Sequence, residues 1–171
     1  MQQIKWFERK FDFANQQNIL PAIIERLKGT STRIKTLLEN YDIEKQKIQI
    51  DNSWSILENI GHLVDLEPLW YGRLDDIISN KEFLRDADLS NTQTHQANHN
   101  EQSLDSLVDQ FQAFRFQTIL QLEQLNEASV FKSALHPRLK QPMRTMDLFL
   151  FVAEHDDHHL ARISELKRLI Q

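Results

Sequence analysis

Two closely spaced histidines carry the strongest chemical signal in this sequence. His155 and His159 are four residues apart in the segment FVAEHDDHHLARI, residues 151–163. On a helix this spacing places both imidazoles on one face, one turn apart, where they can bind the same metal ion. The pair also fills apolar-face positions in the gap between Val152 and Ile163. The pattern therefore predicts a pair of buried metal ligands.

A third histidine is expected to face the same interior. His62, in the segment IGHLVDLEPLW, shares a helical face with Leu66 and Trp70 and should point inward. Three imidazoles buried together without a metal would leave polar atoms unpaired or charges in mutual repulsion. We therefore expect His62, His155 and His159 to hold a divalent ion such as Zn²⁺ or Ni²⁺, with one or more positions open for water or substrate.

Two further residues are candidates for catalytic roles. Asp65 follows His62 by three positions and could orient that ligand or act as a base, although a solvated carboxylate has the same spacing. His158 lies about 100° around the helix from His159, so a substrate-facing role and a surface role are both compatible with its position. The neighbouring Asp156 is expected to face outward and to be solvated.

Other polar residues have weaker claims to a role in the site. His95 and His99 repeat the four-residue spacing, but their Asn- and Gln-rich surroundings offer no apolar helical face. Metal binding by this pair is not expected. Asp157 should face solvent, like the aspartate before it. Arg138 and Lys140 could bind an anionic cofactor, although surface loops commonly carry such residues.

The elements that must position these residues are long helices. Only 3 Gly and 4 Pro occur in 171 residues, which favours a few long elements over many short ones. The sequence therefore predicts an all-α protein, an antiparallel four-helix bundle with long connections. Apolar residues recur at helical spacing over 20–40, with an interruption near Gly29, and over 53–79, 103–127 and 145–170.

The segments between these helices lack helical periodicity. Residues 80–102 are polar and are expected to form a long loop, and 43–50 is expected to be a linker rather than a strand. Residues 4–13 are too aromatic for a free tail and should cross the bundle surface as a short turn or extended arm. No paired strand is expected in the chain.

Two residues of the second predicted helix have local consequences. Pro68 lacks an N–H and clashes with the preceding turn, which predicts a kink over residues 64–68. Gly61 lies beside His62 and should allow a neighbouring helix to approach closely.

Composition excludes several classes of function. The chain is long enough for one domain, which we expect to span residues 1–171. Its net charge of -5 and the absence of a dense Lys/Arg run argue against a nucleic-acid partner. No cysteine is present, so a metal site must use histidines and carboxylates. Charged residues interrupt the apolar N-terminus, so neither a signal peptide nor a membrane span is expected, and the protein should be cytoplasmic.

The segments IGHLVDLEPLW and VAEHDDHHLARI, on this order of helices, resemble the DinB-like superfamily. That superfamily includes YfiT-like metal-dependent hydrolases and low-molecular-weight-thiol S-transferases, and the resemblance covers nearly the whole chain. It implies a metal-binding four-helix bundle, often a homodimer, with His62, His155 and His159 as ligands. The segment THQANHN resembles a stretch before the third helix of close relatives, which implies a loop role for His95 and His99.

The sequence leaves two classes of function open. In the first, a bound divalent ion activates water for hydrolysis, or binds the thiol of a small cofactor for S-transfer to a small-molecule substrate. Because the chain has no cysteine, that thiol would come from solution. The alternative is a non-catalytic binding or oligomerisation module in which the metal staples two helices. A stress-related protein acting on DNA is disfavoured by the acidic charge.

Overall fold

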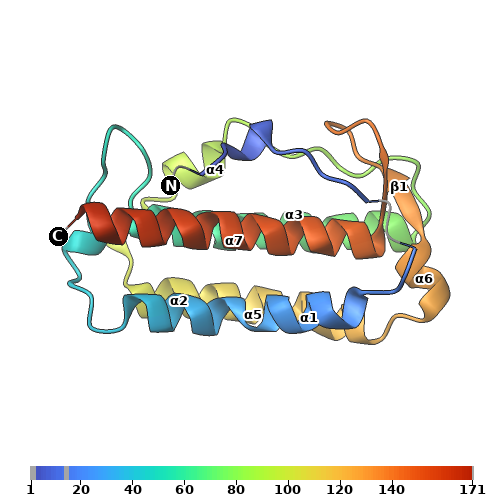
Figure 1. Ribbon diagram of the computed structural model, residues 1–171, viewed down its shortest axis with the longest axis horizontal. Coiled ribbons are helices and arrows are strands. Elements are labelled where there is room, and N and C mark those ends of the chain that lie inside the picture. The colour runs from blue at the N-terminus through green and yellow to red at the C-terminus, as the bar shows by residue number, and fades with distance from the viewer. Residues whose placement is uncertain (1–2, 14–15, 171) are drawn as a thin grey trace.

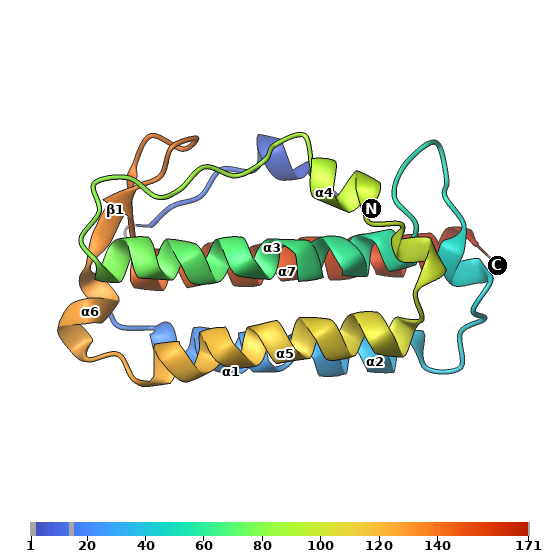
Figure 2. The ribbon, with the colours of Figure 1, turned by 180° about the vertical axis from the view of Figure 1, so that it is seen from behind.

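The computed structural model describes residues 3–13 and 16–170, which form a mostly helical molecule (Figures 1 and 2). Single 3₁₀ turns occur at Trp6–Glu8, Lys45–Lys47 and His99–Glu101. The helices are α1 (Leu20–Lys28), α2 (Thr30–Leu38), α3 (Ile56–Ile78), α4 (Thr92–Gln96), α5 (Leu104–Glu123), α6 (Glu127–Phe131) and α7 (Thr145–Leu169), and the strands are β1 (Ser133–Leu135) and β2 (Pro142–Arg144).

Four long helical rods make the bundle, as predicted. The rods are α1 with α2, then α3, α5 and α7, and they lie along the long axis of the molecule (Figure 1). The connection after α3 returns to the end where α3 began, so α5 runs in the same direction as α3 (Figure 2). The first rod and α7 run in the opposite direction. Each rod therefore has an antiparallel neighbour, and α3 faces α7 along its length.

Local sequence explains where the first two rods begin and break. The predicted helix at 20–40 is interrupted at Gly29, which keeps right-handed helical angles (φ -74, ψ -13) and separates α1 from α2. The helix predicted at 53–79 begins at Ile56 because Ser55 caps it. The Ser55 hydroxyl accepts from the Glu58 backbone N–H, and the Glu58 carboxylate accepts from the Ser55 N–H. Helix α3 then continues through Pro68, and the predicted bend there stays a prediction.

Several short elements depart from the sequence-based expectations. The loop at 80–102 contains α4 and a 3₁₀ turn, and the helix predicted to reach residue 127 ends at Glu123 before the separate α6. The expectation of no paired strand was wrong, because β1 and β2 form an antiparallel hairpin with Ser133 opposite Arg144. Strands of three residues are too short to show the alternation by which a strand is recognised.

Two apolar clusters fill the two ends of the bundle, and an ion network separates them. In that network, Arg115 of α5 donates to Glu67 of α3 and to Asp156 of α7. Thr30, the first residue of α2, donates its hydroxyl proton to Asp156 at 2.8 Å. All four rods therefore meet in one buried polar cluster.

The expectation that Asp156 faces solvent was wrong. Its side chain is completely buried, because α7 packs against other rods on more than one side and Arg115 reaches it from α5. Asp157, by contrast, is partly exposed and forms ion pairs with Arg26 and Arg33. The two adjacent aspartates therefore have different roles.

The N-terminal arm lies across the bundle surface, as predicted from its aromatic residues. Trp6 packs edge-on against Phe151 of α7, with ring centroids 4.9 Å apart. Arg9 forms an ion pair with Glu154, also on α7. These contacts hold the arm over the segment of α7 that carries the histidines.

Within the described ranges, no helix is both long and apolar enough to cross a membrane.

Gly61 has a different neighbour from the one expected. A Cβ at this position would lie 2.2 Å from Cγ of His99, so the close approach is made by the His99 ring and not by another helix. We expect Gly61→Ala to lower the free energy of unfolding by about 1–3 kcal/mol through this overpacking, measured by urea denaturation.

Gly29→Ala is the matched control for this substitution. A Cβ at Gly29 would meet its nearest heavy atom, the Arg26 carbonyl oxygen, at 3.5 Å, which is ordinary contact. Because the backbone there is helical, alanine should be neutral or stabilise the protein by up to about 1 kcal/mol. Equal stabilities of the two variants would contradict the packing of His99 on Gly61.

Candidate metal centre

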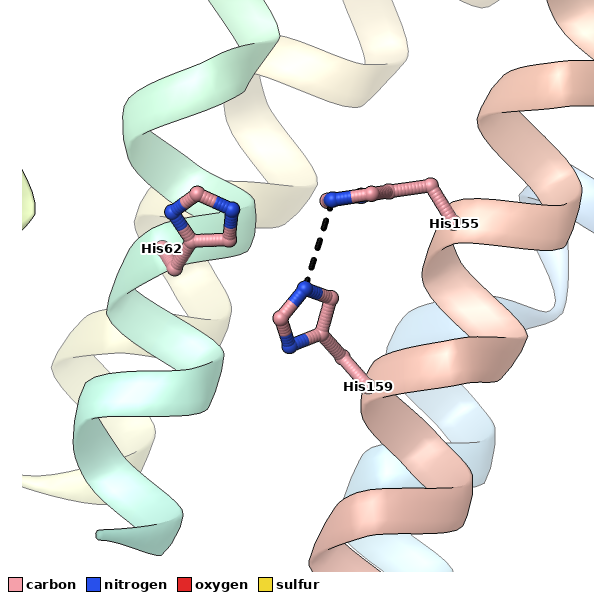
Figure 3. A group of neighbouring side chains, drawn as sticks. All are labelled: His62, His155 and His159. Carbon is pink, nitrogen blue, oxygen red and sulfur yellow. Dashed lines mark hydrogen bonds between the residues drawn. The ribbon is translucent and has the colours of Figure 1, made fainter. Parts of the chain in front are cut away.

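The three histidines predicted as ligands face one another across α3 and α7 (Figure 3). All three side chains are buried, and one ring nitrogen of each lies within 4.8 Å of the others. The Nε2 atoms of His155 and His159 are 3.3 Å apart. Two ligands on a tetrahedral zinc ion, with Zn–N bonds of about 2.0–2.1 Å, would be about 3.3 Å apart. The spacing of this pair therefore fits a shared metal ion.

Asn59 fixes the orientation of His159. The Asn59 amide nitrogen donates to the carbonyl oxygens of Trp54 at 3.2 Å and Ser55 at 2.7 Å. Its Oδ1 must then face His159, whose Nδ1 lies 2.9 Å away. Because Oδ1 can only accept, Nδ1 of His159 carries the proton, and the lone pair of Nε2 points toward the other two histidines.

Thr94 and Asp65 fix His62 in the same way. The Thr94 hydroxyl donates to the Asp65 carboxylate at 2.8 Å, so its oxygen accepts from Nδ1 of His62 at 3.0 Å. The lone pair of His62 Nε2 is then free to bind a metal. Asp65 also bonds to Nε2 of His99 at 2.9 Å, which anchors the segment that carries Thr94.

His155 has no such partner. Its Nδ1 is buried without a hydrogen-bond partner among the described residues, and its ring packs against Trp6 and Trp70 with centroids 4.9 and 5.7 Å away. Since Nε2 of His159 carries a lone pair, Nε2 of His155 must donate its proton to it in the metal-free protein. For both rings to bind one ion through Nε2, the His155 proton would move to Nδ1, because a neutral imidazole ligand carries its proton on the other nitrogen.

The electrostatics of the group favour neutral imidazoles, the form that binds metals. Burial is the largest cause, and it lowers the pKa of His62 to about 4. Burial and mutual repulsion lower the pKa of His155 and of His159 well below the usual value. Three neutral nitrogen donors without a carboxylate suit Zn²⁺, Ni²⁺ or a similar ion better than Mg²⁺ or Ca²⁺.

The histidines form part of the wall of a cavity of about 650 Å³. This volume lies within the range of about 300–1,000 Å³ that is typical of small-molecule sites. Arg138 and Lys140, the cations singled out in the sequence, also line it, whereas Asp65 does not. Much of the rest of the wall is aromatic: Trp6, Phe7, Trp54, Trp70 and Phe151.

The sequence profile of the DinB superfamily matches residues 26–163, which is most of the chain. The chain belongs to the DinB superfamily. The predicted resemblance is thus confirmed. A comparison with curated proteins gives no match.

Solved structures similar to this DinB-superfamily chain share its fold at low sequence identity. YfiT from Bacillus subtilis, described as a probable metal-dependent hydrolase with an unusual four-helix bundle topology, has a TM-score of 0.80 at 19% identity, with 95% of this chain and 93% of that chain covered. A protein from Streptococcus pneumoniae has a TM-score of 0.70 at 11% identity, covering 93% and 96%. An uncharacterized protein from Clostridium difficile 630 has a TM-score of 0.69 at 10% identity, covering 92% and 100%.

The remaining histidines of this DinB-superfamily protein lie outside the three-histidine group. His158 lines the cavity, and its ring lies 5.5 Å from that of His159 and 5.5 Å from that of Trp6. His95 is exposed and contacts Trp54, while His99 is buried against Asp65. The structure therefore does not join the histidines at 95 and 99 in a second group.

Sequence reasoning missed the residues that form hydrogen bonds with the three histidines. Asn59 precedes His62 by three positions on the same helix, so its helical spacing was a usable signal. Thr94 comes from the segment expected to be a polar loop, where no periodicity marks a buried residue. His136, in the β-hairpin, lines the cavity beside Arg73. Neither Thr94 nor His136 was singled out from the sequence.

Removing the hydroxyl that orients His62 should weaken metal binding. We expect Thr94→Val to lower the affinity for the bound ion about 10–100-fold, because His62 Nδ1 loses its acceptor and the ring loses its fixed orientation. Competition with a chelating dye measures this affinity.

Gln93→Ala is the control for the Thr94 substitution. Gln93 also donates to Asp65, at 3.2 Å, but it is exposed and does not contact His62. Its replacement should change metal affinity by less than about twofold. A Thr94→Val protein that binds metal as tightly as the Gln93→Ala protein would contradict the role of Thr94.

Proposed function

We propose that this DinB-superfamily protein is a metal-dependent hydrolase of a small molecule, with His62, His155 and His159 as ligands of a divalent ion. The convergence of two Nε2 lone pairs, fixed by Asn59 and Thr94, carries this assignment. When bound, a divalent ion supplies Lewis-acid activation of water and of a carbonyl or phosphoryl oxygen. The description of YfiT, which shares the fold, supports the same reaction class.

The two candidate catalytic residues have different proposed roles. Asp65 acts as a positioning residue, because its oxygens already accept from Thr94, Gln93 and His99 and it does not line the cavity. His158 lines the cavity beside the ligands and is proposed to contact the substrate. The aromatic wall excludes water from the bound substrate.

Elemental analysis of protein purified without an affinity tag, followed by hydrolysis assays, tests this function. We expect about one metal ion per chain, because the three histidines form a single site. We also expect turnover of an ester or amide panel that a chelator abolishes and the same ion restores. Metal binding without turnover of any substrate would favour the non-catalytic module. No metal after reconstitution would mean that the histidines form a polar network.

Transfer to a low-molecular-weight thiol is the second candidate activity. Arg138 and Lys140 line the same cavity as the histidines, and their charges are suited to an anionic thiol cofactor from solution. Assays that combine thiols with electrophilic substrates distinguish this activity, because S-transfer requires both reactants whereas hydrolysis requires only one.

The non-catalytic alternative needs a closed metal site. A structural metal normally has four protein ligands, whereas the group found in the described part of the chain contains three and borders the cavity. This difference favours an enzyme. We further propose, from the family resemblance, a homodimer, and from the sequence, a single cytoplasmic domain over residues 1–171.

A further inference from the structure

The cavity contains a buried cation that no carboxylate of the described residues contacts, although Asp76 and Asp86 lie near enough to favour its charged form. Arg73 of α3 is only 2% exposed and lines the cavity. Its Nε donates to the Arg85 carbonyl oxygen at 3.1 Å, and its guanidinium lies over the Trp70 ring at 5.5 Å. Across residues 3–13 and 16–170, it forms no ion pair with an acidic side chain. Because buried arginines are almost always paired, this charge needs another explanation.

His136 presents a second donor to the same point. Its Nδ1 accepts from the backbone N–H groups of Arg138 at 3.1 Å and Leu139 at 3.2 Å, so the neutral ring carries its proton on Nε2. Nε2 lies 3.3 Å from Nη1 of Arg73. Two N–H donors thus face each other, and no acceptor of the described residues is recorded between them. Burial, with Arg73 and Arg138 nearby, lowers the pKa of His136 to about 4, so the ring is neutral near pH 7.

The charges around this donor pair favour an anion. Arg138 and Lys140 line the same cavity, and burial lowers the pKa of Arg138. Two carboxylates, Asp86 and Asp88, also line it. Asp88 already accepts from the backbone N–H groups of residues 90 and 92, and Asp86 is exposed.

The donor pair and the three histidines lie on one side of α3. His62 and Arg73 are eleven residues apart, which is three turns plus about 20°, so they share a face and their Cα atoms are about 16 Å apart along the axis. The side chains are closer than the backbone, because the Trp70 ring lies 5.5 Å from the Arg73 guanidinium and 5.7 Å from the His155 ring. Leu66, Leu69 and Trp70 line the cavity between them. A molecule that reaches both ends must therefore be elongated and apolar in its middle.

We propose that the cavity binds an elongated anionic substrate, whose carboxylate or phosphate accepts hydrogen bonds from Arg73 Nη1 and His136 Nε2. The bond to be hydrolysed then lies at His62, His155 and His159. The position of the hydrolysed bond rests on the proposed hydrolase function, whereas the anion site does not require a metal. An oxyanion would satisfy both donors and neutralise the buried charge.

Calorimetric titration of the chelator-treated, metal-free protein tests the anion site. Octanoate and octyl phosphate should each bind at least about tenfold more tightly than octan-1-ol, because only the anions form charge-assisted hydrogen bonds with the donor pair. Arg73→Met should remove this preference and leave octan-1-ol binding unchanged. Equal binding of the three ligands to the wild type, or a preference that persists in the variant, would overturn the anion site.

Two further variants keep this test specific. In His136→Asn, the asparagine oxygen can take the place of Nδ1 and accept from the backbone, while the Nε2 donor is lost. It should weaken octanoate binding at least about threefold even if Arg73→Met does not fold. Arg162→Met is the control, because Arg162 lines the cavity but is paired with Glu165, and it should keep the preference. Loss of the preference in Arg162→Met would contradict the assignment to Arg73.

Kinetics of the metal-loaded protein separate the anion site from the hydrolase. Water cleaves the 4-nitrophenyl monoester of suberic acid to 4-nitrophenol and suberate, and it cleaves neutral 4-nitrophenyl octanoate to 4-nitrophenol and octanoate. We expect at least about tenfold higher kcat/KM for the anionic ester, lost in Arg73→Met through a higher KM. Hydrolysis without this preference would overturn the anion site alone. Anion binding that depends on Arg73, without hydrolysis of either ester, would overturn only the hydrolase.

Discussion

Replacing either His155 or His159 with alanine is expected to abolish stoichiometric metal binding while the bundle persists. Each substitution removes one of three nitrogen donors and should weaken affinity by more than about 100-fold, since loss of a ligand exceeds the effect of losing its hydrogen-bond partner. Metal content should then fall from about one ion per chain to almost none. Elemental analysis after gel filtration measures the metal, and circular dichroism verifies the helices. Hydrolysis should disappear with the ion.

His95→Ala is the control for these ligand substitutions. His95 belongs to the other pair with four-residue spacing, yet it is exposed and lies outside the three-histidine group. It should therefore retain the full metal content. Equal retention of metal in the variants at 95, 155 and 159 would refute the site.

Arg115→Met is expected to destabilise the metal-free protein by about 3–5 kcal/mol. The substitution leaves the carboxylates of Glu67 and Asp156 buried without their shared cation. Their presence raises the pKa of Arg115, so the wild-type guanidinium stays charged across the whole pH range of folding. Urea denaturation gives the free energy of unfolding.

Two controls identify burial as the cause of this loss. Arg26→Met breaks the partly exposed pairs with Glu154 and Asp157 and should have an effect of less than about 1 kcal/mol. Combining Arg115→Met with Glu67→Leu and Asp156→Leu removes all three charges and should restore most of the stability. Arg115→Met and Arg26→Met proteins of equal stability would contradict the importance of the buried network.

The sequence predicted those features that depend on long helical periodicity. The four rods and the inward histidines follow from apolar residues repeated over 20 or more positions, a signal that short elements cannot provide. Asp156 was misplaced because one apolar stripe was assumed for its helix, whereas α7 is packed on several sides. A residue 100° from the stripe can then be as deeply buried as one within it.

The surroundings of the three histidines were less predictable, for a different physical reason. Thr94 and His136 reach the site from connections whose paths depend on tertiary packing, and no local pattern encodes where such a segment lies. Asp65 could be singled out by its spacing from His62. The position of Thr94 between Asp65 and His62 favours the orienting role over the role of a base.

The ion network at Arg115 also restricts how the rods can move against one another. Apolar contacts have no preferred direction, whereas directional bonds to a buried guanidinium are lost by a shift of about 1 Å. Glu67 lies five residues after His62, and Asp156 directly follows His155. The alignment of α3 with α7 is thus fixed beside the histidines, so the three imidazoles are held in position in advance and little of the free energy of binding an ion would be consumed in ordering them.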